Sequence, residues 1–411
     1  MNTKSENNLK LAVFSGALGF TAVVVIWIFL KIMSEGMALI WEDLPAAVNL
    51  PYYTISACTA GGLITGLFRK KFGDYPEELN VVLGKIKNEK KYDYGNMAVM
   101  IAGALLPLLA GSSIGPEAGM TGIIAGLCYW TSDNIKSAGV STREYSEIGS
   151  AVTLGILFHS PLFGIFAVEE NSNDTMPSLK KGNKIFLYGL AITGGTCSYM
   201  LLNHLFGAPM SGFPSFENGH LPETKDYMMI ILYIAAGFIL AFFYEHVHNI
   251  TIKAGNILPS VISETLAGLL LGITGTFVPA VMFSGEEQMA ELMESYTQYL
   301  PWMLIGLAFL KLLLTNICIN FGMKGGHFFP VIFAGVSMGY GIALFTGTNV
   351  VLAAAVVTAT LLGCIMKKPI AVTMLLFICF PVKMFIWLFL GAVTGSRLFP
   401  EKEKSHSPAA E

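Results

Sequence analysis

Charged residues are scarce in this chain. Its 411 residues include 25 Lys and Arg and 28 Asp and Glu, or 13% charged, whereas a soluble domain carries about 25%. Apolar residues make up 54% of the chain and the mean hydropathy is +0.61, so it cannot cover a soluble surface with charge. The shortage excludes a cytosolic enzyme, a nucleic-acid-binding protein and a disordered scaffold. It predicts an all-α protein that crosses a lipid bilayer several times.

Cysteine is also sparse, and its placement excludes two kinds of site. None of the cysteines forms a CxxC pair, and all six lie in apolar stretches: Cys58, Cys128, Cys197, Cys318, Cys364 and Cys379. This pattern is typical of small buried apolar residues rather than of disulfides or zinc ligands. We therefore expect no metal site and no cofactor.

Long uncharged runs indicate the membrane helices, each of which needs about 20 apolar residues. Runs of this kind lie at Leu11–Leu30, Ala46–Phe68, Ile148–Val168, Ile185–Phe206, Tyr227–Tyr244 and Thr265–Gly285. No small-residue cleavage pattern follows the first run, so we interpret it as a membrane helix and not a signal peptide. Two longer runs, Tyr94–Ser132 with one charge and Gly325–Met366 with none, are interrupted by Gly and Pro. They predict short or broken helices whose ends meet inside the membrane.

The two halves of the chain carry similar patterns. The segment Gly115-Pro116-Glu117-Ala118-Gly119 is followed, 46 residues after Gly115, by Pro161 at the start of an apolar helix. The segment Gly326-His327-Phe328-Phe329-Pro330 is followed, 43 residues after Gly326, by Pro369 at the start of another. The match predicts two inverted repeats, about 10–206 and about 225–398, with a substrate site near the midplane. The alternative is that Gly and Pro, which are common in membrane helices, fall at these positions by chance.

The distribution of Lys and Arg predicts the orientation in the membrane. Seven of the 25 Lys and Arg residues lie in segment 69–91, and three more lie in segment 180–184. Segments 207–223 and 284–296 lack both residue types. We expect the N-terminus and the basic loops in the cytoplasm, a single transmembrane domain over residues 1–400, and a polar tail at 401–411. The expected location is the inner (plasma) membrane.

Glu117 is the most informative single residue. It is the only charge in Tyr94–Ser132, and a carboxylate inside a membrane costs about 2.5–3.5 kcal/mol on insertion scales, so it usually faces a cavity or a partner. It follows Gly115-Pro116, where a helix can begin, and a helix N-terminus attracts anions. The carboxylate is therefore a candidate substitute for a diffusing anion, released when protonated. The alternative is an acid that only stabilises the first turn of a helix.

These motifs resemble those of the CLC family of chloride channels and chloride/proton antiporters. Gly115–Gly119 resembles the family's Gly-x-Glu-Gly-Pro segment, with Ala-Gly in place of Gly-Pro. The second motif, Gly326–Pro330, matches Gly-x-Phe-x-Pro in full, and Lys311, Thr315, Gly322 and Gly325 precede it at the family's spacing. The segment Ser160–Glu170 resembles the family's Pro-Leu-x-Gly helix, which ends in paired glutamates.

The sequence departs from the family pattern at three places. The family's Gly-Ser-Gly-x-Pro has its nearest counterpart in Phe72-Gly73-Asp74-Tyr75-Pro76, where Gly73 stands at the serine position and only backbone N–H groups can bind an anion. No tyrosine follows Tyr340, so the family's second central ligand is absent or replaced. Counted from Pro161, Glu170 falls on the first glutamate of the pair and Asn171 on the second, the position that transfers protons.

The resemblance implies a homodimer with one anion pore per subunit and many short, tilted helices. It implies that Glu117 closes the outer end of the path when ionised and that Glu170 is the internal proton donor. The breaks at 72–76, 115–119 and 326–330 would aim helix N-termini at one anion, so that Gly73, Asp74 and Tyr75 join Gly115–Ala118 and Gly326–Phe329 around it. The expected function is transport of chloride or a similar anion, as a channel or as an anion/proton antiporter, and not catalysis.

Other interpretations of single features remain at this point. Gly111-Ser112-Ser113-Ile114-Gly115 matches G-x-S-x-G, which would suit an intramembrane hydrolase with His159 or His204 as base, although a helix rather than a strand precedes it. Asp74, Glu117 and Glu169 or Glu170 would instead be cation ligands in a cation- or proton-coupled carrier. Lys311 could add positive potential, snorkel to the surface or pair with a carboxylate.

Overall fold

The computed structural model describes residues 3–48, 50–76, 95–134, 152, 155, 160–169, 181–209, 214–216, 222–377 and 379–400. In the first half the elements are α1 (Thr3–Ala38), η1 (Leu39–Asp43), α2 (Leu44–Val48), α3 (Tyr53–Phe72), α5 (Met97–Leu109), α6 (Glu117–Asn134), α8 (Pro161–Glu169) and α9 (Lys181–Phe206).

In the second half the elements are α10 (Thr224–Met228), α11 (Ile230–Ile257), α12 (Ser260–Phe277), η2 (Pro279–Val281), α13 (Glu286–Ser295), η3 (Tyr296–Gln298), α14 (Pro301–Asn320), α15 (Phe328–Thr346), α16 (Val350–Met366), α17 (Pro369–Leu376), η4 (Val382–Met384) and α18 (Phe385–Leu398). All regular elements within the described ranges are helical, as predicted.

Five helical segments of the described part are long and apolar enough to cross a membrane: Ser15–Val48, Ile230–Ile257, Ser260–Phe277, Pro301–Asn320 and Phe328–Thr346. The two long uncharged runs are each divided between two helices, as their Gly and Pro content predicts. The first run forms α5 and α6, and the second forms α15 and α16. Proline stands at the first position of α8, α14 and α17, where its missing N–H costs no helical hydrogen bond.

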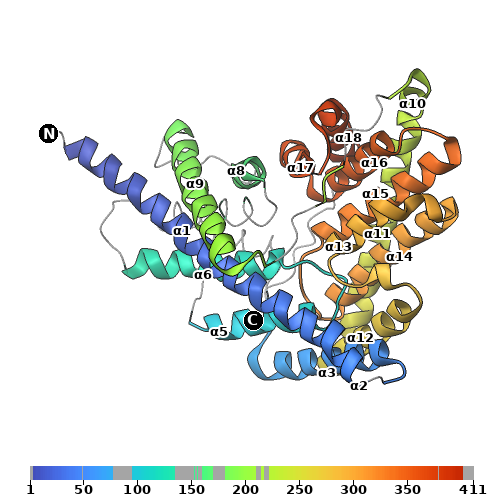
Figure 1. Cartoon of the computed structure of the whole chain (residues 1–411), viewed down its shortest axis with the longest axis horizontal. Helices are drawn as coiled ribbons and strands as arrows, with labels where there is room; N and C mark the ends of the chain where they lie inside the picture. The colour runs from blue at the N-terminus through green and yellow to red at the C-terminus, as the bar shows by residue number, and fades with distance from the viewer. Residues whose placement is uncertain are drawn as a thin grey trace.

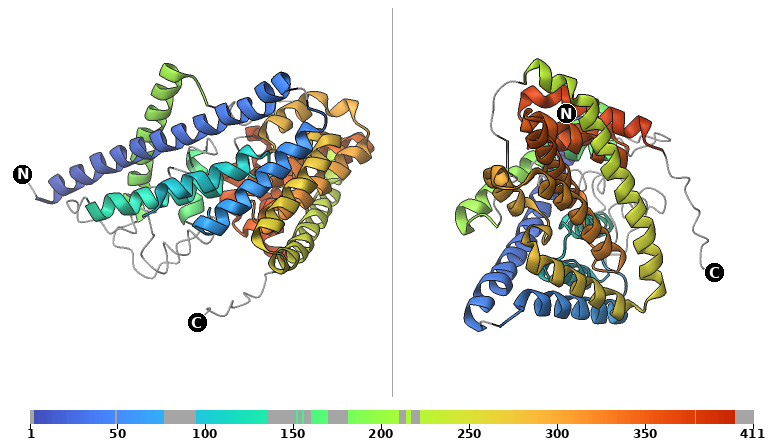
Figure 2. Two further views of the ribbon diagram at one scale, coloured as in Figure 1. Left: turned by 90° about the horizontal axis from the view of Figure 1, so that it is seen from below. Right: turned by 90° about the vertical axis from the view of Figure 1, so that its right-hand side faces the viewer.

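The two halves pack against each other through elements at corresponding positions. Helix α3 packs along α12, and the short α8 packs against α17. The Ser160 hydroxyl, just before α8, donates to the Met374 carbonyl in α17 at 2.9 Å. Figures 1 and 2 show the long α1 beside α9 at one side of the molecule and the helices from α11 to α18 gathered at the other. The first residues of α6 and α15, Glu117 and Phe328, are buried in the interior.

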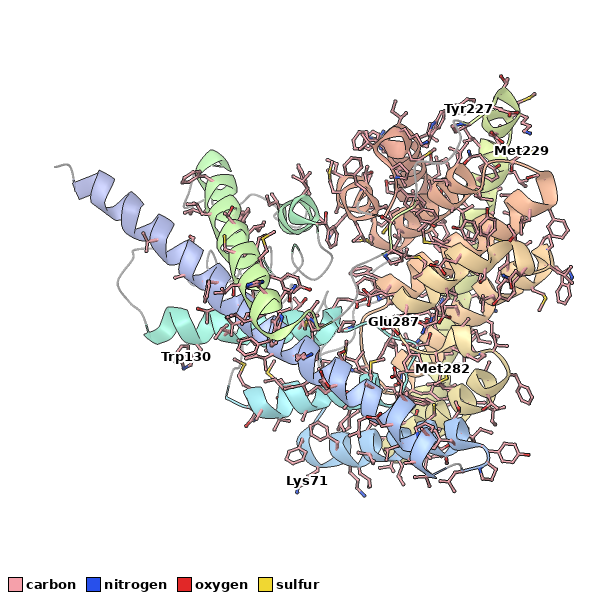
Figure 3. All side chains as sticks on the ribbon, in the orientation of Figure 1. Lys71, Trp130, Tyr227, Met229, Met282 and Glu287 are labelled. Carbon is pink, nitrogen blue, oxygen red and sulfur yellow. The ribbon has the colours of Figure 1, made fainter. Side chains whose placement is uncertain are left out.

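Helix α15 is the most enclosed of the long helices. It packs against α14 and α16, and 89% of the residues in its most apolar 18-residue stretch are buried inside the protein. By contrast, Trp130 projects from the outer face of α6 and Lys71 from the end of α3 (Figure 3). A helix enclosed by protein can begin in the middle of the fold, because neighbouring backbone rather than lipid meets its unpaired N–H groups.

Candidate functional site

The two glycine breaks meet inside the molecule. The Gly115 amide donates to the Gly326 carbonyl at 2.8 Å, and the Gly326 amide donates to the Gly115 carbonyl at 2.7 Å. This pair of hydrogen bonds fixes the start of α6 beside the start of α15. Segments that lie more than 200 residues apart in the sequence thus form one site.

The side chain of Glu117 fills the space between these two helix starts. It is 1% exposed, and its Oε1 accepts a hydrogen bond from the Phe328 amide at 2.8 Å. Its Oε2 is buried without a hydrogen-bond partner, and the ion pairs found in the described part of the chain do not include Glu117. A side chain at Gly115 or Gly326 would overlap this carboxylate. Glycine at both positions therefore makes the room that the acid occupies.

The two helix N-termini that meet at this position favour a negative charge there. Glu117 is the first residue of α6, and its carboxylate meets the first residue of α15. The unpaired amides of a helix N-terminus act as about half a positive charge. Ala118 and Phe329 are also buried and close the site to bulk water. An anion held here would find backbone donors and helix dipoles, and the described ion pairs place no Lys or Arg on Glu117 that would trap it.

A cavity of about 220 Å³ reaches this loop from one side. Ile114 and Pro116, on either side of Gly115, line it together with Trp41 and Glu286. Another lining residue, Glu287, lies near the junction of the two halves in Figure 3. The loop that leads to Glu117 thus forms part of the cavity wall.

Lys311 supports the wall of that cavity. It is fully buried in α14, and its ammonium donates to the carbonyls of Val281, Met282 and Phe283 at 3.1, 2.9 and 2.9 Å. Snorkelling is therefore wrong for this residue, and the ion pairs of the described residues do not include it. Its acceptors are backbone oxygens of a turn 28 to 30 residues away, which no sequence pattern identifies.

The third predicted break lies at the end of α3. Gly73 has φ +98°, and its amide donates to the Arg69 carbonyl at 2.9 Å, which ends the helix. The Tyr75 amide donates to the Gly73 carbonyl at 3.1 Å. Both amides thus already have acceptors within the loop. The residues that follow Pro76 lie outside the described ranges, so a helix N-terminus at this break stays a prediction.

The carboxylate of Asp74 is engaged by two cations rather than left as an isolated negative charge. The Lys324 ammonium contacts its Oδ2, and Nη2 of Arg69 lies 2.5 Å from its Oδ1. Partial burial opposes ionisation of Asp74, but the hydrogen bonds and charges of Lys324 and Arg69 outweigh it and hold the pKa of Asp74 below its ordinary value.

Several other sequence candidates fall elsewhere. Glu170 and Asn171 lie outside the described residues, so the internal proton donor stays a prediction. The His327 ring packs against those of Tyr244 and Phe328, at centroid distances of 6.1 and 4.8 Å. The Ser113 hydroxyl shares a hydrogen bond with Thr315, and the Ser112 hydroxyl donates to the Met323 sulfur. The bonds of these two serines are those of helix packing, not of a nucleophile beside a base.

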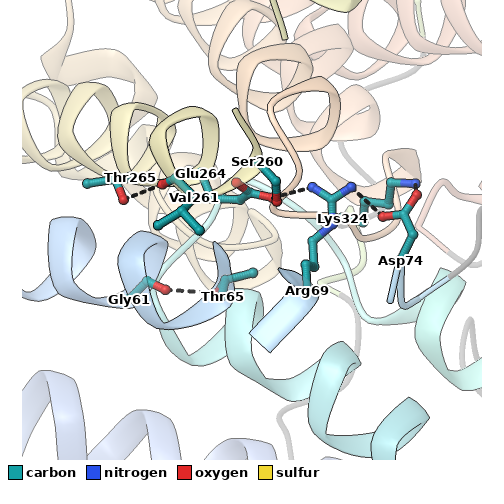
Figure 4. Close-up of polar contacts among 9 residues, drawn as sticks. All are labelled: Gly61, Thr65, Arg69, Asp74, Ser260, Val261, Glu264, Thr265 and Lys324. Atoms are coloured by element: carbon teal, nitrogen blue, oxygen red, sulfur yellow. Dashed lines mark hydrogen bonds and ion pairs between the residues drawn. The ribbon is translucent and has the colours of Figure 1, made fainter. Parts of the chain in front are cut away.

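The sequence did not identify three charged residues near Asp74 as site candidates: Arg69, Glu264 and Lys324. Glu264 is 0% exposed, and its carboxylate contacts the Arg69 guanidinium (Figure 4). The signal for it was present, since Glu264 is the only charge between Lys253 and Glu286. The same isolation identified Glu117.

Comparison with known proteins agrees with this architecture. Residues 61–399 match the family described as voltage gated chloride channel. The chain belongs to this family. A protein of Escherichia fergusonii that carries the name YfeO and an ion-transport description is 23% identical over 379 residues, which cover 89% of this chain and 86% of the relative. The protein of the same name from Escherichia coli strain 55989 has the same identity and coverage.

Two solved structures share the fold. The crystal structure of a slow cyanobacterial Cl⁻/H⁺ antiporter has a TM-score of 0.74 at 17% identity and covers 97% of this chain and 95% of its own. The structure of a CLC-type fluoride/proton antiporter also has a TM-score of 0.74, at 18% identity, with 96% of each chain covered. The predicted CLC-like, all-α membrane fold is thereby confirmed.

Proposed function

We propose that this chain moves a small monovalent anion, chloride or a close relative of it, across a membrane, and that Glu117 is the gate. The main support is the position of the Glu117 carboxylate, which is buried on the Phe328 amide at the start of α15 and pairs with no cation among the described residues. When ionised, this carboxylate occupies the place of an anion. When protonated, it loses most of its attraction to the helix N-terminus and leaves the place to the diffusing ion.

Glu117→Gln tests the gate in proteoliposomes that contain the purified chain. Glutamine keeps the shape of the acid and lacks its charge, so it cannot compete with an anion. We expect the variant to raise chloride flux severalfold at neutral pH and to remove the dependence of flux on pH. Glu35→Gln is the matched control, because Glu35 is 67% exposed at the end of α1, where it pairs with Lys31. An unchanged rate and pH profile in Glu117→Gln would remove Glu117 from the mechanism.

We propose further that anion movement is coupled to protons. The burial of Glu117 favours this mode, because an acid that must be protonated to leave its place carries a proton with each opening. The two similar solved structures are those of antiporters, which supports the same mode. The reversal potential under opposed chloride and proton gradients is the test. A coupled exchanger reverses at a potential that moves with the proton gradient, and a channel reverses at the chloride potential alone.

The geometry favours an anion over the cation carrier that the acidic residues also suggest. A cation at Glu117 would lie against the positive ends of α6 and α15. Asp74 already has two cationic partners. Sodium-driven uptake without any dependence on chloride would reverse this preference.

For its setting, we propose a multi-pass protein of the inner (plasma) membrane, with the N-terminus and the basic end of α3 on the cytoplasmic side, assembled as a homodimer and without enzymatic activity. The basic last turn of α3, with Arg69, Lys70 and Lys71, supports the orientation. Family membership supports the dimer. The mass of the protein in lipid nanodiscs tests the dimer, and labelling of a single cysteine introduced beside Lys71 tests the orientation.

A further inference from the structure

Four charged side chains form a continuous cluster where α3 ends, and the gate does not use them. In Figure 4 they alternate in sign: Glu264, Arg69, Asp74 and Lys324. Arg69 contacts Glu264 through Nη1 and Asp74 through Nη2, and Lys324 contacts the other oxygen of Asp74. Ser260 donates to Glu264 at 3.0 Å. With two positive and two negative members, the cluster is neutral as it stands.

The members of the cluster differ sharply in burial. The Glu264 side chain is 0% exposed and those of Arg69 and Lys324 are 18% and 22% exposed, whereas that of Asp74 is 54% exposed. Separating Arg69 from Glu264 would leave a buried charge unpaired, which is strongly unfavourable. Moving Asp74 into water costs little, because exposed ion pairs contribute little free energy. Without Asp74 the remaining three side chains carry a net charge of +1, located on the half-buried Lys324.

The cluster borders the same segment that holds Glu117. Lys324 stands two residues before Gly326, which carries the bridge to Gly115. Gly322 has φ +110°, and a side chain there would overlap both the Arg69 guanidinium and the Glu264 carboxylate. The turn into α15 therefore passes directly over the Arg69–Glu264 pair. On the other side, Pro76 lies within contact of a side chain added at Gly119, close to the start of α6.

The cluster and the 220 Å³ cavity lie at opposite ends of α3. Tyr53, at the first residue of α3, packs edge-on against Trp41 of the cavity wall. Arg69 lies 16 residues further along α3. Because an α-helix rises 1.5 Å per residue, Tyr53 and Arg69 are about 24 Å apart along the helix axis. The Glu117 site is thus approached by the cavity from one end and by the charged cluster from the other.

We propose that Arg69 and Lys324 form an anion-recruiting site at this end of α3, and that Asp74 is its resident, displaceable carboxylate. A small monovalent anion of the halide type takes the place of Asp74 beside Lys324, while Glu264 keeps Arg69 in position. The inference rests on the proposed function and adds to it a second tethered carboxylate, on the opposite side of the path from the cavity.

The test compares Asp74→Asn and Lys324→Gln in chloride efflux from proteoliposomes as a function of chloride concentration. If the cluster binds anions, the two variants should shift half-saturation in opposite directions. Asp74→Asn should lower the half-saturating chloride concentration about threefold, and Lys324→Gln should raise it about threefold. A threefold change in affinity corresponds to the free energy of one partly exposed ion pair. The double variant should show no further gain from Asp74→Asn, because the cation that it frees is gone.

A salt bridge that merely holds the two loops together predicts a different result. Breaking it from either side would then shift half-saturation in the same direction, and that outcome overturns the proposal, as does no shift in either variant. The matched controls are Asp43→Asn and Lys253→Gln, which should leave half-saturation unchanged. Asp43 is exposed near the cavity end of α3, and Lys253 is exposed on α11. The pH dependence of flux should persist in both cluster variants. Its loss in Glu117→Gln therefore reports on the gate separately.

Discussion

Two single charges inside apolar helices, Glu117 and Lys311, are held in opposite ways. Glu117 meets amide donors at a helix start and leaves one carboxylate oxygen without a partner. Lys311 is saturated, because its ammonium has three carbonyl acceptors. A group with all of its hydrogen bonds made is fixed, whereas a buried oxygen without a partner favours exchange. At the scale of the residue, Lys311 is therefore structural and Glu117 is the group that can move.

Lys311→Met tests the structural role. Methionine fills similar space but leaves the carbonyls of Val281, Met282 and Phe283 without their shared donor, a loss of about 1–3 kcal/mol for an unsatisfied buried polar group. We expect the thermal unfolding midpoint of the purified protein to fall by several degrees. Lys253→Met, at an exposed position of α11, is the control. A midpoint unchanged in both variants would show that the three hydrogen bonds add nothing net to stability.

The critical contact between elements is the one between the starts of α6 and α15. Two backbone hydrogen bonds join Gly115 to Gly326, and the Glu117 carboxylate fits only because neither residue has a side chain. Helix α15 is buried from Phe328 to Ala343, and moving it would disturb its packed neighbours, whereas a side chain can change rotamer without moving the backbone. Crowding at this contact should therefore displace the acid before it displaces the helix.

Gly326→Ala tests this contact. The added methyl group would overlap the Glu117 carboxylate, so the acid must turn away, and we expect flux to rise and its pH dependence to weaken, as in Glu117→Gln. Gly306→Ala is the matched control, since a methyl group on this α14 glycine meets nothing within 4 Å. In a Glu117→Ala background, Gly326→Ala should add no further effect. Wild-type pH dependence in the folded single variant would show that the carboxylate does not need this space.

At the scale of the whole molecule, local patterns predicted the elements and the meeting of the two glycine breaks, but not the individual long-range contacts. The uncharged runs, the Gly and Pro breaks and the isolation of Glu117 in Tyr94–Ser132 predicted the broken α5–α6 and α15–α16 pairs, because these depend on neighbouring residues. Glu117 and Phe328 are 211 residues apart, and Asp74 and Lys324 are 250 apart. Such pairings arise from packing of the two halves, so the ion pairs of Asp74 and the carbonyl acceptors of Lys311 appear only in the folded chain.

In the proposed mechanism, the Glu117 carboxylate and a diffusing anion compete for one place at the start of α15. Anomalous diffraction from crystals soaked in bromide tests it most directly, with wild type and Glu117→Gln compared at a pH where the acid is ionised. We expect a bromide peak within hydrogen-bonding distance of the Phe328 amide in Glu117→Gln and none there in wild type. Bromide bound beside an unmoved Glu117 in wild type, or no bromide at this amide in the variant, would contradict it.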